Sequence, residues 1–272
     1  MSEIICPVCP HHCHIPEGGT GACRARGNRN GQSVPLNYGK LTSLAIDPIE
    51  KKPLAHFYPG SWILSAGSFG CNFACPFCQN HTISMHGEND SSYYEISPAE
   101  LAGIALKHTE SIGIAFTYNE PTIGWEYIRD TAELVKPFGQ KIVLVTNGCV
   151  SEDILEELLP YVDAMNIDLK GDRAFYRELH GDYDTVKHTI ERAQQKCHVE
   201  VTTLVIPGKN DRTEWIREEA RWLASLDRKI VLHLSRYFPR YRYSIPATDI
   251  VRMREMKKAA EEYLDTVLLG NV

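Results

Sequence analysis

The sequence predicts an α/β fold built around a parallel sheet. From about residue 61 onward, short apolar runs alternate with longer segments whose apolar residues recur at helical spacing. Nearly continuous apolar runs suit parallel strands that are covered on both faces, and the alternation is typical of strand–helix units. Six such units fit a partial (βα)6 TIM-like barrel. A chain of 272 residues is long enough for one large domain with a full core.

The chain divides into three predicted parts. Residues 1–35 are rich in Cys, His, Gly and Pro, so we expect a small N-terminal Cys-rich metal-binding lobe. Residues 36–60 are predicted to form a connecting arm, in which Tyr38–Ile46 alternates weakly between apolar and polar residues. The partial barrel is expected to take residues 61–272.

The barrel elements follow from local patterns. The predicted strands are Trp62–Ala66, Ile112–Thr117, Lys141–Thr146, Ala164–Asp168, Val199–Ile206 and Lys229–Ser235, followed by a short final strand, Thr266–Leu269. A capping box with proline at the first helical position, Ser97-Pro98-Ala99-Glu100, predicts one helix start. Apolar residues at helical spacing predict further helices over Trp125–Val135, Glu152–Leu159, Asp184–Gln195, Thr213–Leu226 and Val251–Tyr263.

Composition narrows the class of protein. The net charge of -6 argues against nucleic-acid binding by the whole surface, so a nucleic-acid partner is not expected. No stretch is apolar enough to span a bilayer and the N-terminus lacks a signal-peptide core, so we expect no membrane partner and a cytoplasmic location. Nine cysteines in a cytosolic chain favour metal ligation over disulfides.

Cys71, Cys75 and Cys78 form the most informative motif, with the spacing C-x3-C-x2-C in one short loop. Three thiolates can hold three corners of a 4Fe-4S cluster and leave one iron without a protein ligand. An open metal position is a place for a substrate or cofactor to bind. The alternative is a structural zinc site, for which His81 would be a fourth ligand.

This spacing resembles the signature of the radical SAM superfamily, in which an aromatic residue such as Phe77 usually precedes the third cysteine. The resemblance implies that S-adenosyl-L-methionine (SAM) binds the open iron. One electron from the cluster then cleaves SAM to a 5′-deoxyadenosyl radical, which abstracts hydrogen from a substrate. It also implies the partial barrel and an oxidoreductase-type enzyme.

Segments after the predicted strands supply the expected SAM contacts. On the resemblance, these are Phe77, Glu120, Asn147, Asp168, Lys170 and His233. Glu120 would face the SAM ammonium, and Lys170 would neutralise the methionine carboxylate. The alternatives are purely structural roles: a turn at Asn119-Glu120-Pro121, an exposed ion pair for Asp168 and Lys170, and a hydrogen-bonded core histidine for His233.

A second metal site is predicted in the N-terminal lobe at Cys6, Cys9, Cys13 and Cys23. Four cysteines can close a zinc site or hold an auxiliary iron–sulfur cluster, and the spacing does not separate the two. The lobe has almost no core of its own, so a metal should fold it.

With this lobe, the run Asp47–Leu54 and His56-Phe57 makes the chain similar to one branch of the superfamily, the pyruvate-formate-lyase-activating-enzyme-like proteins encoded beside Memo-like proteins. This resemblance implies a ferredoxin or flavodoxin as reductant. The substrate stays open between a glycine of a partner protein, as in glycyl-radical-enzyme activation, a small molecule, a peptide and a modified RNA base.

The competing function is a non-catalytic zinc-binding scaffold or nucleic-acid adaptor. Two further expectations concern the barrel mouth. The basic and aromatic run at residues 236–243 is expected to cover it. Cys149 is either a thiol hydrogen donor at the cavity or a buried, inert cysteine.

Overall fold

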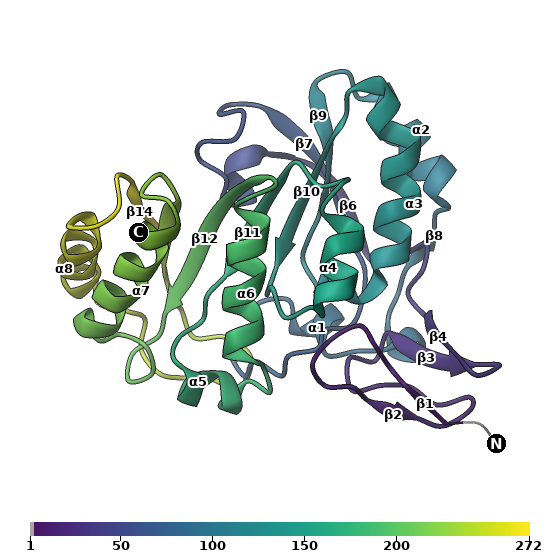
Figure 1. Ribbon diagram of the computed structural model, residues 1–272, viewed down its shortest axis with the longest axis horizontal. Helices are drawn as coiled ribbons and strands as arrows, with labels where there is room; N and C mark the ends of the chain where they lie inside the picture. Colours follow the sequence, from purple (N-terminus) through teal and green to yellow (C-terminus); the bar gives the residue numbers. More distant parts are fainter. Residues whose placement is uncertain (1–2) are drawn as a thin grey trace.

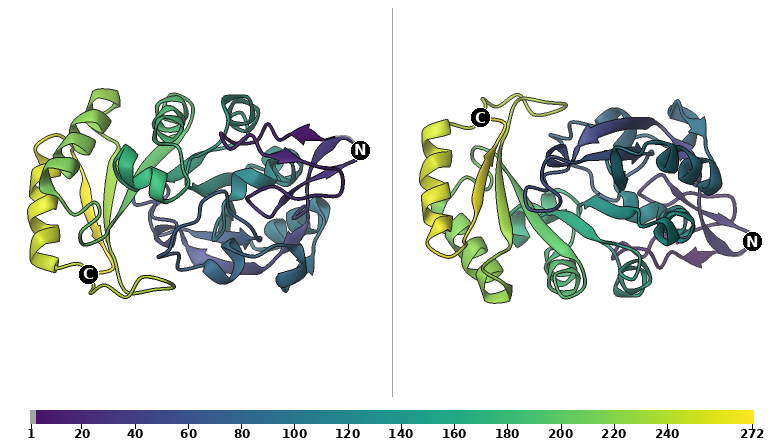
Figure 2. Two further views of the ribbon diagram at one scale, coloured as in Figure 1. Left: turned by 90° about the horizontal axis from the view of Figure 1, so that it is seen from below. Right: turned by 90° about the horizontal axis from the view of Figure 1, so that it is seen from above.

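The computed structural model describes residues 3–272, and its centre is one eight-stranded sheet. The strand order is β6-β7-β9-β10-β11-β12-β13-β14, and every neighbouring pair is parallel except β6 and β7. The strands are β6 (Ser43–Pro48), β7 (Trp62–Gly67), β9 (Ser111–Phe116), β10 (Lys141–Thr146), β11 (Ala164–Asp168), β12 (His198–Val205), β13 (Val231–Arg236) and β14 (Val267–Gly270). The strands curve around an interior with helices on the outside (Figure 2).

The helices connect successive parallel strands, as Figure 1 shows. They are α2 (Pro98–Lys107), α3 (Trp125–Val135), α4 (Glu152–Leu158), α6 (Tyr183–Ala193), α7 (Thr213–Leu226) and α8 (Ile250–Glu261), with two short helices, α1 (His81–Ser84) and α5 (Arg173–Glu178). The Ser97 hydroxyl accepts from the Glu100 N–H, and the Glu100 carboxylate accepts from the Ser97 N–H, so the predicted capping box starts α2. The partial TIM-like barrel is therefore confirmed.

The first antiparallel strand lies inside the predicted connecting arm. Residues of β6 pair with β7 from Ser43 opposite Gly67 to Pro48 opposite Trp62. The sheet therefore begins before residue 61, while the predicted three-part division stays a prediction. Beyond β6, the segment 49–57 packs Ile49, Leu54 and Phe57 into one apolar cluster with residues of β7, β9, β10 and β11.

Small hairpins complete the described chain. They pair β1 (Ile4–Ile5) with β2 (His14–Ile15), β3 (Arg26–Arg29) with β4 (Gln32–Pro35), and β5 (Lys40–Leu41) with β8 (Tyr94–Glu95). The N-terminal hairpins dock on the barrel through Arg26, whose Nη1 donates to both carboxylate oxygens of Glu126 over 2.7 Å.

No helix among residues 3–272 has the length and apolar character needed to cross a bilayer.

Candidate functional site

A cavity of about 860 Å³ lies inside the barrel, within the size range of small-molecule sites. Its wall contains residues that follow the strand ends, such as Asn147 and Lys170, as expected for a barrel active site. It also contains residues from both edges of the open sheet, Lys51 beside β6 and Leu269 on β14. The cavity therefore extends to the gap between the two edge strands.

The predicted cysteines Cys71, Cys75 and Cys78 all line this cavity. They lie in the segment between β7 and α1, residues 68–80, which we call the cluster loop. Burial raises the pKa of all three thiols, to about 12 for Cys75, while the nearby charge of Lys170 opposes the rise at Cys75 and Cys78. Binding iron would therefore have to displace protons from these thiols.

Across residues 3–272, no three His, Cys, Asp or Glu side chains are close enough together to hold one metal ion. A four-iron cluster takes one thiolate per iron, so its cysteines need not converge on one point. A zinc ion does need its ligands around one centre. The ring of His81 stacks on Tyr241 with ring centroids 4.4 Å apart, and its Nδ1 lies 3.3 Å from the Cys78 carbonyl oxygen.

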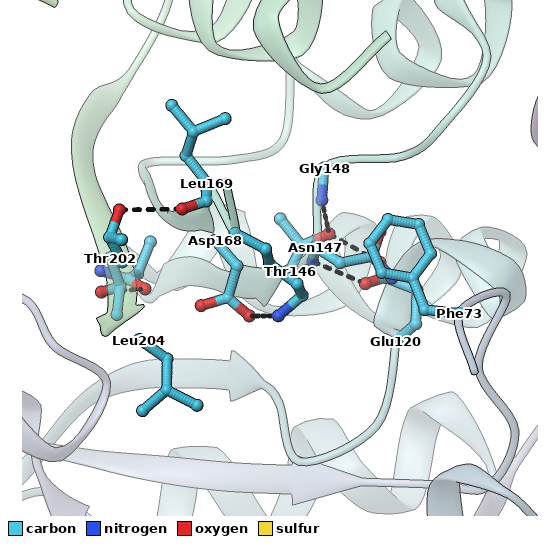
Figure 3. Close-up of polar contacts among 12 residues, drawn as sticks. Phe73, Glu120, Thr146, Asn147, Gly148, Asp168, Leu169, Thr202 and Leu204 are labelled. Carbon is cyan, nitrogen blue, oxygen red and sulfur yellow. Dashed lines mark hydrogen bonds and ion pairs between the residues drawn. The ribbon is translucent and has the colours of Figure 1, made fainter. Parts of the chain in front are cut away.

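Glu120 is buried in the segment after β9 and binds both its own turn and the segment after β10. Its Oε1 accepts from the Thr122 N–H, the Thr122 hydroxyl and the Thr146 hydroxyl, and its Oε2 accepts from the Asn147 N–H over 2.7 Å. Glu120, Thr146 and Asn147 lie together in Figure 3, and all three line the cavity. Burial raises the pKa of Glu120, and the hydrogen bonds oppose that rise. Each carboxylate oxygen offers about two acceptor positions, and Oε2 has one protein contact, so it keeps one position for a ligand.

Asn147 joins the segment after β10 to the cluster loop. Its Nδ2 donates to Oδ1 of Asn72 over 2.8 Å and lies 3.7 Å from Sγ of Cys71. Asn72 in turn donates to the carbonyl of Cys149 over 2.7 Å. The turn at Asn147-Gly148, with Gly148 at φ +70°, therefore also positions a side chain at the predicted cluster.

Asp168 and Lys170 form an ion pair at the end of β11, with Nζ 2.8 Å from Oδ2. Both residues line the cavity. The alternative expectation, an ion pair exposed on the protein surface, therefore does not describe this pair. Burial lowers the pKa of Lys170, but Asp168 and Cys75 raise it more, and the net shift is upward. Lys170 therefore stays charged and can neutralise an anionic group in the cavity.

His233 lines the cavity and is held by a carboxylate that the sequence did not indicate. Its Nε2 lies 2.6 Å from Oε2 of Glu200, whose other oxygen lies 2.9 Å from Nε2 of His198. The N–H groups of Ala55 and His56 also donate to Glu200. Burial would raise the pKa of Glu200, but these hydrogen bonds lower it to about 2. One signal was available, a lone acid inside the apolar run Val199–Val201.

A second missed cluster joins Asp47, Lys52 and Tyr118. Lys52 Nζ lies 2.9 Å from Asp47 Oδ2 and 4.7 Å from the centre of the Tyr118 ring, and the Tyr118 hydroxyl donates to Asp47 over 2.8 Å. The Lys52 side chain is only 3% exposed and lines the cavity, so it is not part of a solvated charged turn. Tyr118 adopts φ +74°, a strained conformation of the kind found at functional sites.

The basic and aromatic run at residues 236–243, which the sequence predicts to cover the barrel mouth, packs against the cluster loop. The Arg242 N–H donates to the Pro76 carbonyl over 2.8 Å, and the Tyr243 ring lies 5.8 Å from that of Phe77. Phe77 also lines the cavity. Cys149 is buried in the main hydrophobic core and, unlike the three cluster cysteines, does not line the cavity, which favours the inert alternative.

The four N-terminal cysteines lie in one small lobe, residues 3–35, which we call the cysteine lobe. Negative charge on Cys6 or Cys23 would raise the pKa of Cys9, and negative charge on Cys6 or Cys13 would raise that of Cys23. Burial has the larger effect and raises the pKa of Cys9 to about 12. No three of them are close enough to hold one metal ion within the described chain. The second metal site therefore stays a prediction.

Comparisons with known proteins identify a family and several relatives of this chain. A family model, the radical SAM superfamily, matches residues 67–222. The uncharacterized protein MJ0808 of Methanocaldococcus jannaschii is 38% identical over all of this chain and 82% of its own length. A protein of the same organism, MJ1227, which is provisionally named a glycyl-radical enzyme activating enzyme, is 24% identical over 75% of this chain and 87% of its own.

Among solved structures, a radical SAM methyltransferase from Sphaerobacter thermophilus is similar in fold. It superposes with a TM-score of 0.58 and 15% identity, covering 78% of this chain and 67% of that one.

Proposed function

The chain belongs to the radical SAM superfamily, and on that premise we propose that Cys71, Cys75 and Cys78 hold a 4Fe-4S cluster whose fourth iron binds SAM. The chain is an enzyme, and its family implies both the cluster and SAM. The proposal is supported by one arrangement above all: three thiols of a single loop and the Asp168–Lys170 pair line the same cavity. The non-catalytic scaffold is not retained.

When bound and reduced by one electron, the cluster supplies the electron that cleaves a carbon–sulfur bond of SAM and releases a 5′-deoxyadenosyl radical. The protein's contribution is binding, orientation and exclusion of water. We assign Lys170 to the methionine carboxylate, because it is a buried cation that its partner keeps charged. Glu120 has an acceptor position left for the SAM ammonium, and Asn147, Phe77 and His233 complete the proposed contacts.

We propose that the radical abstracts hydrogen from a substrate that enters between the sheet edges, where Lys51 and Leu269 line the cavity. Glycyl-radical-enzyme activation is the finer candidate, and the name given to the relative MJ1227 supports it. The electron would come from a low-potential ferredoxin or flavodoxin. We place this chemistry in the cytoplasm, where thiols stay reduced.

For the four cysteines of the cysteine lobe we propose an auxiliary 4Fe-4S cluster. These thiols are near enough for the charge of one to affect the pKa of another, yet no three of them in the described chain surround one point. This arrangement suits a cluster, in which each iron takes one thiolate, better than a single zinc ion. Backbone N–H groups directed at sulfur are usual around such clusters, and Cys13 Sγ accepts one from Ala22 over 3.4 Å. Metal analysis tests this: the Cys13→Ser variant should lose iron, whereas zinc in the wild type would contradict it.

The main proposal is tested on anaerobically reconstituted protein by measuring 5′-deoxyadenosine formed from SAM with dithionite. The Cys75→Ala variant should lose this product and most of its cluster iron, because an iron loses its ligand. Cys197→Ala is the matched control, since Cys197 packs against the core away from the cavity. Retained product formation in Cys75→Ala would overturn the assignment.

A further inference from the structure

The cysteine lobe lies directly against the backbone of the cluster loop. The N–H of Cys71 donates to the carbonyl of Cys23 over 3.1 Å. The preceding residue, Gly70, has φ +84°, and a Cβ atom there would lie 2.6 Å from that same carbonyl oxygen. Glycine alone tolerates so close an approach in this conformation. The lobe therefore touches the loop at its first cysteine.

Asn72 is the side chain that extends this contact toward the site. Its side chain is buried, and its backbone carbonyl lies 2.8 Å from Nε2 of His11 in the lobe. On its other side, Oδ1 of Asn72 accepts from Nδ2 of Asn147 over 2.8 Å. The same nitrogen of Asn147 lies 3.7 Å from Sγ of Cys71. Two asparagines thus connect His11 of the lobe with a thiol of the cluster loop.

We propose that Asn72 is a positioning residue that ties the cysteine lobe to Asn147 and so keeps the Asn147 amide on the sulfur of Cys71. The inference rests on the proposed function and deepens it, because it says what holds a hydrogen bond on a cluster ligand. The Asn147 amide has two protein anchors: its Oδ1 accepts from the Cys149 N–H over 2.8 Å, and its Nδ2 donates to Asn72. Its backbone N–H is held by Glu120, so Asn72 is the anchor on the nitrogen that faces the Cys71 sulfur.

A hydrogen bond to a cluster sulfur has a measurable consequence. Such bonds are among the determinants of an iron–sulfur reduction potential, because they stabilise the more electron-rich, reduced state. Partners that orient a ligand also affect metal retention, typically by 10- to 100-fold when mutated. If Asn72 holds Asn147 in place, its loss should lower the potential of the cluster and weaken iron retention. A residue that only stabilises the fold would not change the potential.

The test compares full-length wild type with Asn72→Ala, each anaerobically reconstituted. Potentiometry followed by electron paramagnetic resonance gives the potential, and the spectral change on adding SAM reports its binding. We expect a lower potential, a smaller SAM-induced change and about 10-fold weaker iron retention in Asn72→Ala. Asn37→Ala is the matched control: Asn37 is equally buried and donates to the Phe69 carbonyl in the cluster loop, but has no link to Asn147.

The lobe side of the link is tested with His11→Ala, which removes a contact to the Asn72 backbone without touching a cysteine. It should shift the potential in the same direction, and adding it to Asn72→Ala should produce less than the summed effect, since both act through one path. Unchanged potentials in Asn72→Ala, or equal shifts in Asn37→Ala, would overturn the inference. If the wild type forms no 5′-deoxyadenosine, the proposed function fails instead.

Discussion

Single buried carboxylates organise much of this site. Glu120 accepts hydrogen bonds from the segments after β9 and β10, and Glu200 accepts from the segment 55–56 and from histidines on β12 and β13. Each carboxylate thus joins segments that are distant in the sequence. A buried carboxylate is costly unless it is hydrogen-bonded or paired, and these two serve as shared acceptors for several segments, so we expect their removal to affect the whole site.

Replacing Glu120 by Gln should destabilise the protein and weaken SAM binding. The Gln amide group is a donor, so one of the donors that now face the carboxylate would be left opposite another donor. An unsatisfied buried group costs about 1–3 kcal/mol, and the negative charge proposed to face the SAM ammonium is also lost. Urea unfolding and equilibrium binding of SAM measure the two effects.

Glu157→Gln is the control for this change, because Glu157 is exposed on α4. It should leave both quantities unchanged. A Glu120→Gln variant with wild-type stability and SAM affinity would show that the four observed acceptor contacts are dispensable.

At the level of elements, the close packing of loop and lobe depends on glycine. Gly70→Ala adds a Cβ atom 2.6 Å from the Cys23 carbonyl, in a backbone conformation that disfavours side chains. Gly208→Ala has a similar φ of +73° but meets no atom within 4 Å. We expect Gly208→Ala to cost about 1 kcal/mol from strain alone, and Gly70→Ala to cost more and to lose cluster iron. Thermal unfolding and iron analysis compare them, and equal losses would contradict the close contact.

The packing of α7 on the sheet makes stability depend on pH. Glu219 is buried on α7; its Oε1 accepts from the Thr203 hydroxyl, and no partner reaches Oε2 in the described structure. Burial raises the pKa of Glu219 to about 8. The folded protein therefore keeps a proton that the unfolded chain releases above about pH 4.5, so stability should fall as pH rises from there to about 8.

Glu219→Gln removes this titration while keeping an acceptor for Thr203. The variant should gain stability relative to wild type between about pH 5 and about pH 8, by a few kcal/mol at most. Urea unfolding at both pH values measures this, and the exposed neighbour Glu218→Gln should show no such gain. A pH-independent difference between Glu219→Gln and wild type would exclude the titration.

On the scale of the whole molecule, the cysteine lobe is docked on the barrel by a largely buried ion pair. Arg26 is 3% exposed and donates to both oxygens of Glu126 on α3. Removing one partner leaves the charge of the other partly buried and unpaired. We expect Arg26→Met to cost about 3 kcal/mol and to expose the lobe to proteolysis, as urea unfolding and limited digestion would measure.

The double variant Arg26→Met with Glu126→Met separates two effects: the loss of the contact that docks the lobe, and the cost of burying an unpaired charge. It should regain part of the stability lost in Arg26→Met, because no unpaired charge remains. Equal stability of the single and double variants would mean that the pair does not hold the lobe.

The sequence alone determined the strand–helix order and the three cluster cysteines, because both are local patterns. Apolar periodicity and capping boxes act within a few residues, and the cysteine motif lies in one loop. Tertiary structure alone decided the partners of Glu200, Lys52 and Asn72. The Ala55 N–H and Glu200 are 145 residues apart, and Asn72 and Asn147 are 75 apart. Such contacts arise only once the sheet's register brings remote strand ends to one cavity, which no local pattern encodes.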